Sequence, residues 1–332
     1  MNTKKENKFL LPLDVMKDGR EYESLKDCKG LHFDIATEMQ RSLLEIEKAR
    51  GRHAICYLGN VIKGGIDASI NGKDDLPFNE MIIQVPKDVK EIDIVLVTAG
   101  GLADQVSKFV TILRPRFDKV NFILLDKAMS AGTIFIMSGD EIVMSKNSHF
   151  GPIDPQIQKK DGTLKPAQAI IVALNDIKRR GDTFKAMGKP IPWTDVVVLK
   201  NLDLLDFGMA ITASQHSADL VRDYLVRYKF REWRIHSTGN PVKDEERVKR
   251  ASEIAQKLCD HGKWKSHGHA IYRDEAEQVC KLKITHAESI PGLEKAMRRM
   301  LALCCFVFDE TNISKLFISD NYKVLFSKNQ VK

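Results

Sequence analysis

Two short apolar segments, each ending in a turn of small residues, constrain the fold of this chain more than any other feature. Residues 92–98 run directly into Ala-Gly-Gly at 99–101, and residues 120–125 lead to Ala-Met-Ser-Ala-Gly-Thr at 128–133. Short β-branched runs that are apolar on both faces are typical of buried parallel strands. Residues 102–114 between them carry apolar side chains at helical spacing. The pattern therefore predicts a right-handed β-α-β crossover, which brings both turns to the carboxyl edge of one sheet.

Ser130 in the second turn is the candidate nucleophile. A serine hydroxyl attacks a carbonyl only when a base takes its proton and the developing oxyanion is stabilised. Ala131 opens the next helix, where backbone N–H groups are unpaired, and Gly101 can present a second amide from the neighbouring turn that Gly100 shapes. The other interpretation is that Ser130 is a small residue that lets a helix pack on the sheet. Spacing alone does not separate the two.

Four segments in this order resemble a known family. They are Thr-Ala-Gly-Gly at 98–101, Met-Ser-Ala-Gly-Thr at 129–133, Asp-Glu-Ile-Val-Met at 140–144 and Gly-Pro-Ile-Asp-Pro-Gln at 151–156. They are similar to the Clp/crotonase-fold serine peptidases related to signal peptide peptidase A, and most of all to the serine dehydrogenase proteinase family. A later segment around Trp264 adds to the resemblance, which extends over roughly residues 35–300. The chain departs from the family at Ala99, where the family has proline, and at Lys-Leu-Lys 281–283.

The resemblance implies an α/β protein with a Clp/crotonase-like fold of repeated β-β-α units and a helical C-terminal part. We expect a polar, irregular N-terminal arm at residues 1–30 and a Clp-like serine protease domain at 31–305. Residues 306–332 are expected to form a C-terminal tail. Alternating apolar residues at 315–319 and 322–326 flank Asp-Asn, which predicts a β-hairpin in this tail. We expect the hairpin to provide an edge strand or an oligomer contact.

The motifs leave the general base open. Clp proteases have a histidine about where Ile153 and Asp154 stand here. In Ser-Lys relatives, a lysine from a later helix or from the loop before it approaches the serine, and burial can lower the pKa of such a lysine enough for it to act as a base. Lys165 and Lys178 are the candidates, and the alternative for both is a solvated surface lysine. Further candidates for the base or for a supporting role are His149 and His267.

Asp154 is expected to orient a loop through hydrogen bonds to the backbone. His267 and His269 lie beside Trp264, but no third ligand is evident in the sequence, so we expect no metal. We also expect no cofactor. A pyridoxal-phosphate dehydratase would need a Schiff-base lysine and a glycine-rich phosphate loop, and neither arrangement occurs.

Composition narrows the function classes. The chain has 52 Lys+Arg against 45 Asp+Glu, a net charge of +7, and these charges are dispersed, so a nucleic-acid partner is not expected. Its six cysteines include no Cys-x-x-Cys pair and are expected to be reduced core residues of a cytoplasmic protein. No apolar stretch is long enough to span a membrane.

The sequence therefore predicts a serine peptidase that acts on peptides or proteins, with a backbone oxyanion hole and a Ser-Lys mechanism. It would be ATP-independent, because the phosphate-loop motif is absent. It would also be homo-oligomeric, as relatives of this fold are. Two alternatives stay open. One is a catalytically inactive Clp-fold scaffold, and the other is crotonase chemistry on acyl-CoA, which does not require the serine.

Overall fold

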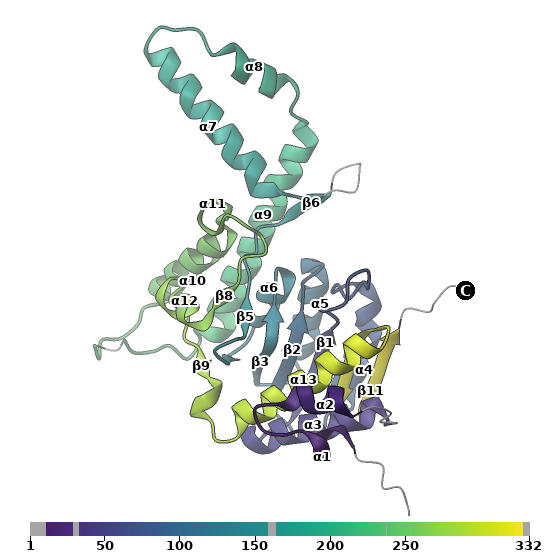
Figure 1. The fold of residues 1–332 in the computed structure, drawn as a ribbon. Helices are drawn as coiled ribbons and strands as arrows, with labels where there is room; N and C mark the ends of the chain where they lie inside the picture. Colours follow the sequence, from purple (N-terminus) through teal and green to yellow (C-terminus); the bar gives the residue numbers. More distant parts are fainter. Residues whose placement is uncertain (1–10, 29–32, 159–163, 237, 328–332) are drawn as a thin grey trace, which may run out of the picture.

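The computed structural model describes residues 11–28, 33–158, 164–236 and 238–327. Its centre is a mixed sheet with the strand order β11-β10-β1-β2-β3-β4-β9 (Figure 1). Strands β1 to β4 pair in parallel, so β2 and β3 end at the same edge. The strands of this path are β1 (Ala54–Gly59), β2 (Glu91–Thr98), β3 (Lys119–Ala128), β4 (Glu141–Met144), β9 (Thr285–His286), β10 (Ile313–Ser319) and β11 (Tyr322–Ser327).

Helices bury both faces of the sheet, which explains why its strands are apolar throughout. On β1, Ile55 and Tyr57 join the core on one face, whereas Cys56 and Leu58 join the core on the other. The first core is closed by α4 (Asp75–Ile83), α5 (Ala103–Leu113) and α6 (Ala131–Met137), and the second by α3 (Ile35–Arg50) and α13 (Leu293–Glu310). The central crossover is therefore β2-α5-β3-α6, as predicted.

A second group of helices follows the sheet. Strand β5 (His149–Phe150) pairs with the end of β3 and with β8 (Ile271–Tyr272). The helices near it are α9 (Leu204–Tyr224), its π-helical continuation η2 (Leu225–Lys229), α10 (Asp244–Cys259), α11 (His261–Trp264) and α12 (Arg273–Gln278). Two short 3-10 turns occur elsewhere in the chain, η1 (Gly72–Asp74) before α4 and η3 (Ala287–Ser289) before α13.

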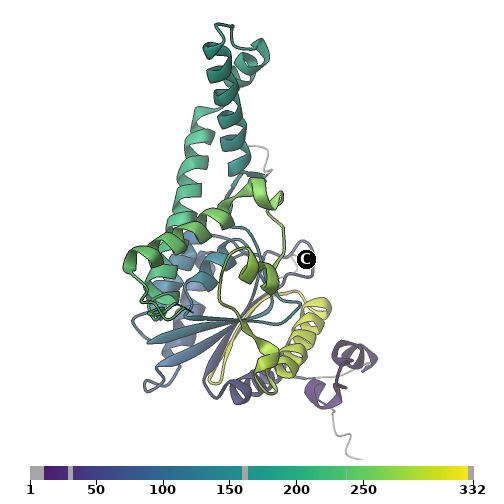
Figure 2. The same cartoon turned by 90° about the vertical axis from the view of Figure 1, so that its left-hand side faces the viewer.

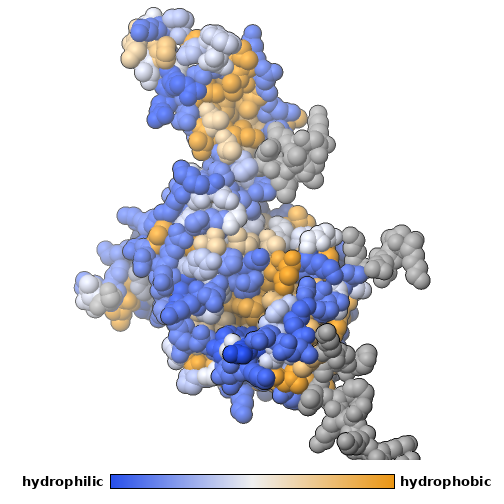
Figure 3. Space-filling view, in the orientation of Figure 1, coloured by the Kyte–Doolittle hydropathy of each residue, from blue (hydrophilic) through white to orange (hydrophobic). Residues whose placement is uncertain are grey.

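One helical segment extends away from the sheet. Strands β6 (Gln156–Gln158) and β7 (Leu164–Pro166) form a small hairpin that leads into α7 (Ala167–Ala186) and α8 (Trp193–Lys200). Figures 1 and 2 both show α7, α8 and the start of α9 standing clear of the body, and we call residues 167–210 the helical projection. Figure 3 shows apolar residues on its surface. The exposed ones include Met187, Ile191, Trp193, Val197, Val198 and Leu205.

The N-terminal expectation was wrong for residues 12–27. These residues form α1 (Pro12–Val15) and α2 (Glu21–Asp27), and α2 packs against α13. Leu13 and Leu25 are buried in the core beneath α3 and α13, and the Leu13 amide donates to Glu38 at 3.2 Å. Buried apolar side chains thus anchor the segment despite its polar composition. The polar sequence at residues 158–162 also favours a hairpin-like turn, but this segment lies mostly outside the described residues.

The C-terminal β-hairpin is confirmed. Strands β10 and β11 pair around Asp320, and β10 also pairs antiparallel with β1. The hairpin therefore extends the main sheet. A helix at α8 was not predicted, because residues 193–200 contain three consecutive valines and little helical periodicity. Among the described residues, no helix combines the length and the apolar character needed to cross a bilayer.

Candidate active site

Ser130 occupies a strained turn between β3 and α6. Its backbone has φ 51° and ψ −116°, a conformation that residues other than glycine rarely adopt. Such strain costs about 1–3 kcal/mol and persists only where the surroundings impose it, often at functional sites. The side chain is half-buried, and its hydroxyl makes no hydrogen bond to another described residue. A sharp strand-to-helix turn that presents a serine is the geometry of a nucleophile elbow.

The glycine turn after β2 packs directly against Ser130. A Cβ added to Gly100, whose φ is 101°, would lie 2.7 Å from the Met129 carbonyl oxygen and 2.8 Å from the Ser130 Cβ. The Met129 amide donates to the Thr98 carbonyl at 3.0 Å, which ties the two turns together. The prediction that both turns share one sheet edge is confirmed, and Gly100 is required by close approach as well as by its φ.

Two backbone amides, one in the glycine turn and one in the serine turn, are unpaired within the described part of the chain. The Gly100 amide is not one of them, because it donates to Thr98 Oγ1 at 3.0 Å. In the glycine turn, the Ile70 amide donates to the Gly100 carbonyl, and the Leu102 amide donates to the Ile70 carbonyl. Neither hydrogen bond uses the Gly101 amide. The Ala131 amide is at the first position of α6, where no intrahelical acceptor exists. These two amides can stabilise a developing oxyanion.

Thr133 joins the serine turn to the loop at residues 151–156. Its Oγ1 lies 2.8 Å from the carbonyl oxygens of Ala128 and Gly151, and it accepts a hydrogen bond from the Gly151 amide at 3.1 Å. Gly151 also packs so closely on Met129 that a Cβ would overlap that side chain. The Gly-Pro-Ile-Asp-Pro-Gln segment is thereby held against the nucleophile turn.

Asp154 is a fully buried carboxylate between two histidines. His267 Nδ1 lies 2.8 Å from one carboxylate oxygen, and His261 Nδ1 lies 2.9 Å from the other. Among the described residues, its carboxylate pairs with these side chains and not with the backbone donors that were expected, and the pairs join the loop to α11 and the segment after it. The sequence did not point to His261, which has no motif around it. Only its position one residue after the helix cap Asp260 could have drawn attention to it.

His149 lies apart from this pair. It is on β5, and its ring packs against Tyr272 with ring centroids 5.3 Å apart. Its Nδ1 is buried and has no hydrogen-bond partner among the described residues. No contact in the described part of the chain connects His149 with Ser130 or Asp154.

The two candidate lysines lie in different surroundings. Lys178 is on α7 in the helical projection, is largely exposed and pairs with Asp182 at 3.4 Å. It is about 18 Å along the helix from Pro166, at 1.5 Å per residue. Lys165 is in β7, opposite Ile157 of β6, at the base of the projection. The Ala167 amide donates to the Pro155 carbonyl at 2.8 Å, so this base is tied to the loop that Thr133 holds.

Within the described ranges, one group of side chains could hold a metal ion, and it was not predicted. Glu47, His53 and Asp320 place one ligand atom each within 4.8 Å of one another. They lie where α3, the start of β1 and the β10–β11 turn meet, away from the Ser130 edge of the sheet. Burial raises the pKa of Glu47 to about 7, against hydrogen bonding from the Ala54 amide. The six cysteines are all free, as predicted, and burial raises the pKa of Cys280 to about 11.

Comparison with known proteins identifies the region that carries this site. Residues 38–183 match the ClpP-like SDH-type serine proteinase family. Two uncharacterised proteins of Methanocaldococcus jannaschii are similar to parts of the chain. MJ1495 is 32% identical over 126 residues, which are 35% of this chain and 41% of the relative, and MJ0137 is 34% identical over 89 residues, 27% and 29% respectively. The chain spans less than half the length of these relatives.

Solved structures of proteases overlap with the chain in part. A variant of the 1510-N membrane-bound stomatin-specific protease has 21% sequence identity and a TM-score of 0.28, covering 40% of this chain and 67% of its own. ClpP1 from Listeria monocytogenes has 14% identity and a TM-score of 0.26, covering 46% and 80%. The residues that match the family model include Gly100, Gly101, Ser130 and Ala131. Residues 38–183, less than half of the chain, are thus similar to the ClpP-like SDH-type serine proteinase family.

Proposed function

We propose that this protein is an ATP-independent serine peptidase in which Ser130 attacks the substrate carbonyl. The observation that carries the proposal is the strained Ser130 turn beside the unpaired amides of Gly101 and Ala131. A preorganised pair of donors is worth most where charge develops in the transition state, and one such donor typically contributes about 100- to 1,000-fold in rate. ATP independence is proposed because the sequence contains no phosphate-loop motif.

We assign the general base to Lys165 rather than Lys178. Lys165 lies at the base of the helical projection, next to the loop that packs on the serine turn. Lys178 lies on an exposed helix surface and is paired with Asp182, so its ammonium stays hydrated. In the proposed reaction, a neutral Lys165 amine takes the Ser130 proton as Oγ bonds to the carbonyl carbon. The resulting ammonium then protonates the leaving amine, and water hydrolyses the acyl-enzyme.

Asp154 acts as a positioning residue in this scheme. It accepts from His261 and His267 and so holds the loop at residues 151–156 in place. His149 has no role in the proposed reaction, because it packs on Tyr272 and, among the described contacts, touches neither Ser130 nor Asp154.

We further propose that the active form is a cytoplasmic homo-oligomer that takes peptides or unfolded proteins. The exposed apolar residues of the helical projection, including Trp193 and Leu205, support self-association. Six free cysteines, four of them buried, fit a reducing compartment. Multi-angle light scattering tests the assembly, and a monomer at micromolar concentration contradicts it.

Hydrolysis of fluorescently labelled, unfolded casein and of a mixed peptide library, without nucleotide, tests the activity. Wild-type protein should cleave, Ser130→Ala should lose cleavage, and Ser252→Ala, a change at a partly exposed position on α10, should retain it. Cleavage by Ser130→Ala at the wild-type rate contradicts the proposal. A folded wild-type protein that cleaves nothing in the library favours the inactive scaffold.

A further inference from the structure

A basic cavity lies at the opposite edge of the sheet from Ser130. It has a volume of about 690 Å³, within the range of ligand pockets, and is formed by η2, the segment that follows it, α10 and the loop before β9. Asp140 on its wall donates its amide to Val120 at the start of β3, whereas Ser130 follows the end of that strand. About ten residues of strand, roughly 30 Å, separate the two places. The cavity is therefore a second site.

Its lining has an excess of positive charge. Five cations line the cavity, and Arg250 pairs with Glu253 at 3.3 Å. The other four have no ion pair or side-chain hydrogen bond to any residue that the structure describes. They are Lys229, Arg234, Lys281 and Lys283.

The two carboxylates of the cavity wall do not neutralise them. Asp140 pairs with Arg114 at 2.7 Å and with Arg231 at 2.8 Å. Glu232 is exposed and lies 3.9 Å from Arg231. The nearby Glu141 accepts from Arg50 at 2.5 Å and from Thr285 at 2.7 Å. These acidic groups thus pair with other residues, and only Asp140 and Glu141 also act on Lys229, through their charge.

Lys229 distinguishes the excess of positive charge in this cavity from that of an ordinary surface. Unpaired lysines on an open surface are ordinary, but the Lys229 side chain is half-buried where the π-helix ends. Burial lowers the pKa of its ammonium to about 8; the charges of Glu141 and Asp140 oppose that effect, and the charge of Lys283 adds to it. A half-buried cation next to a second cation is unfavourable unless an anion lies between them.

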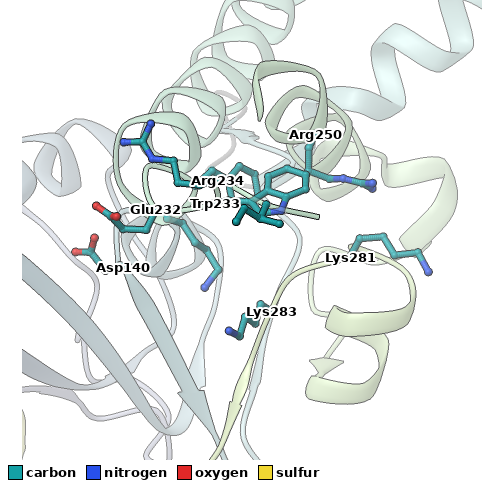
Figure 4. A pocket seen from close by; sticks show the side chains of 10 residues that line it. Asp140, Glu232, Trp233, Arg234, Arg250, Lys281 and Lys283 are labelled. Carbon is teal, nitrogen blue, oxygen red and sulfur yellow. The ribbon is translucent and has the colours of Figure 1, made fainter. Parts of the chain in front are cut away.

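The opposite part of the wall is apolar and aromatic. It contains Phe230 and Trp233, whose ring centroids are 5.6 Å apart, and Ile235, which is 64% exposed. Figure 4 shows Trp233 over the cavity, with Lys281 and Lys283 on the facing wall. A ligand that satisfies both parts has a strongly anionic end and a flat apolar end.

We propose that this cavity binds a nucleotide, with the phosphates between Lys229 and Lys283 and the base against Trp233. Charge-assisted hydrogen bonds from lysine and arginine to phosphate are the stronger kind, and an indole ring offers a face for stacking. Binding involves no hydrolysis and does not depend on the proposed peptidase activity. The site has none of the phosphate-loop sequence that nucleotide hydrolases use.

Isothermal titration of the full chain at low salt tests the proposal with three probes. ADP should bind, and inorganic pyrophosphate and adenosine should each bind at least tenfold more weakly, because each lacks half of the complementary chemistry. No ADP binding at 1 mM overturns the proposal. If pyrophosphate binds as tightly as ADP, the proposed contact between the base and Trp233 is overturned.

Matched variants locate the site. Lys229→Met combined with Lys283→Met should weaken ADP binding at least tenfold, whereas Lys189→Met combined with Lys200→Met, the same charge change on the helical projection, should leave it unchanged. Equal losses in both pairs indicate non-specific electrostatics and contradict the site. Lys283→Met alone, at an exposed position, keeps the test decisive if the Lys229 change affects folding.

Discussion

The serine edge of the sheet and the helical projection are built on different principles. At the serine edge, backbone approaches backbone so closely that Gly100 and Gly101 have no space for a Cβ. In the projection, a Cβ added at Gly181 or Gly208 would meet no atom within 4 Å, and valines and a tryptophan face solvent. Close packing at the edge holds the reactive groups in fixed positions, whereas the projection exposes apolar surface.

This contrast bears directly on the choice of base. A base must stay within hydrogen-bond reach of the serine, which requires a support as rigid as the serine turn itself. The β6–β7 hairpin at the foot of the projection is tied to the edge by the Ala167–Pro155 hydrogen bond. Among the described residues, the middle of α7, where Lys178 lies, makes no such hydrogen bond to the edge.

The largest difference is therefore expected between substitutions of Lys165 and Lys178, in their effect on the hydrolysis rate. Lys165→Met should lower the hydrolysis rate by about 100- to 10,000-fold, the usual contribution of a general base. Lys178→Met should change it less than twofold, because that side chain pairs only with Asp182 among the described residues. The reverse result places the base on the projection and removes the distinction between the two regions. Initial rates on the labelled casein, with oligomeric state checked for both variants, decide it.

Alanine at two glycines should have opposite effects on stability. Gly101→Ala should lower the free energy of unfolding by about 1–3 kcal/mol or more, because its Cβ would overlap the Ile70 backbone at φ 150°. Gly181→Ala, inside α7 with open space around it, should raise that free energy by up to about 1 kcal/mol. Urea denaturation measures both. Equal tolerance at the two positions contradicts the close approach of Gly101 to Ile70.

The loss of stability should also differ between neutralising a buried aspartate at the serine edge and neutralising one in the helical projection. Asp154→Asn should cost about 1–3 kcal/mol of stability, since it leaves one of its two partly buried histidine partners without a carboxylate oxygen. Asp195→Asn, which removes the partner of the half-exposed Arg180 in the projection, should cost less. Chemical denaturation at pH 7 compares them. A larger loss for Asp195→Asn contradicts this ranking.

The stability of the body should also depend on pH. Burial raises the pKa of Glu47 from 4.5 to about 7, so the folded chain holds a proton there that the unfolded chain has lost. Stability attributable to Glu47 therefore falls as pH rises from about 4.5 to about 7. Glu47→Gln should remove this fall. Asp182→Asn on the projection is the control, and an unchanged profile in Glu47→Gln contradicts the assignment.

The same contrast explains what the sequence could predict. The edge is built from short-range patterns, namely apolar strands, glycines and a serine between small residues, so β2, α5, β3 and the adjacency of Gly100 and Ser130 were predicted. The His261–Asp154 pair joins residues 107 positions apart and has no local pattern. Likewise α8 lacks helical periodicity, and α1 and α2 depend on tertiary contacts with α13.

Labelling with a fluorophosphonate probe, followed by intact mass measurement, tests the central claim most directly, because it needs no knowledge of the substrate. We predict one adduct on the wild-type protein, its loss in Ser130→Ala and its retention in Ser252→Ala. An adduct that survives in Ser130→Ala, or no adduct on a folded and assembled wild-type protein, contradicts the claim that this turn activates Ser130.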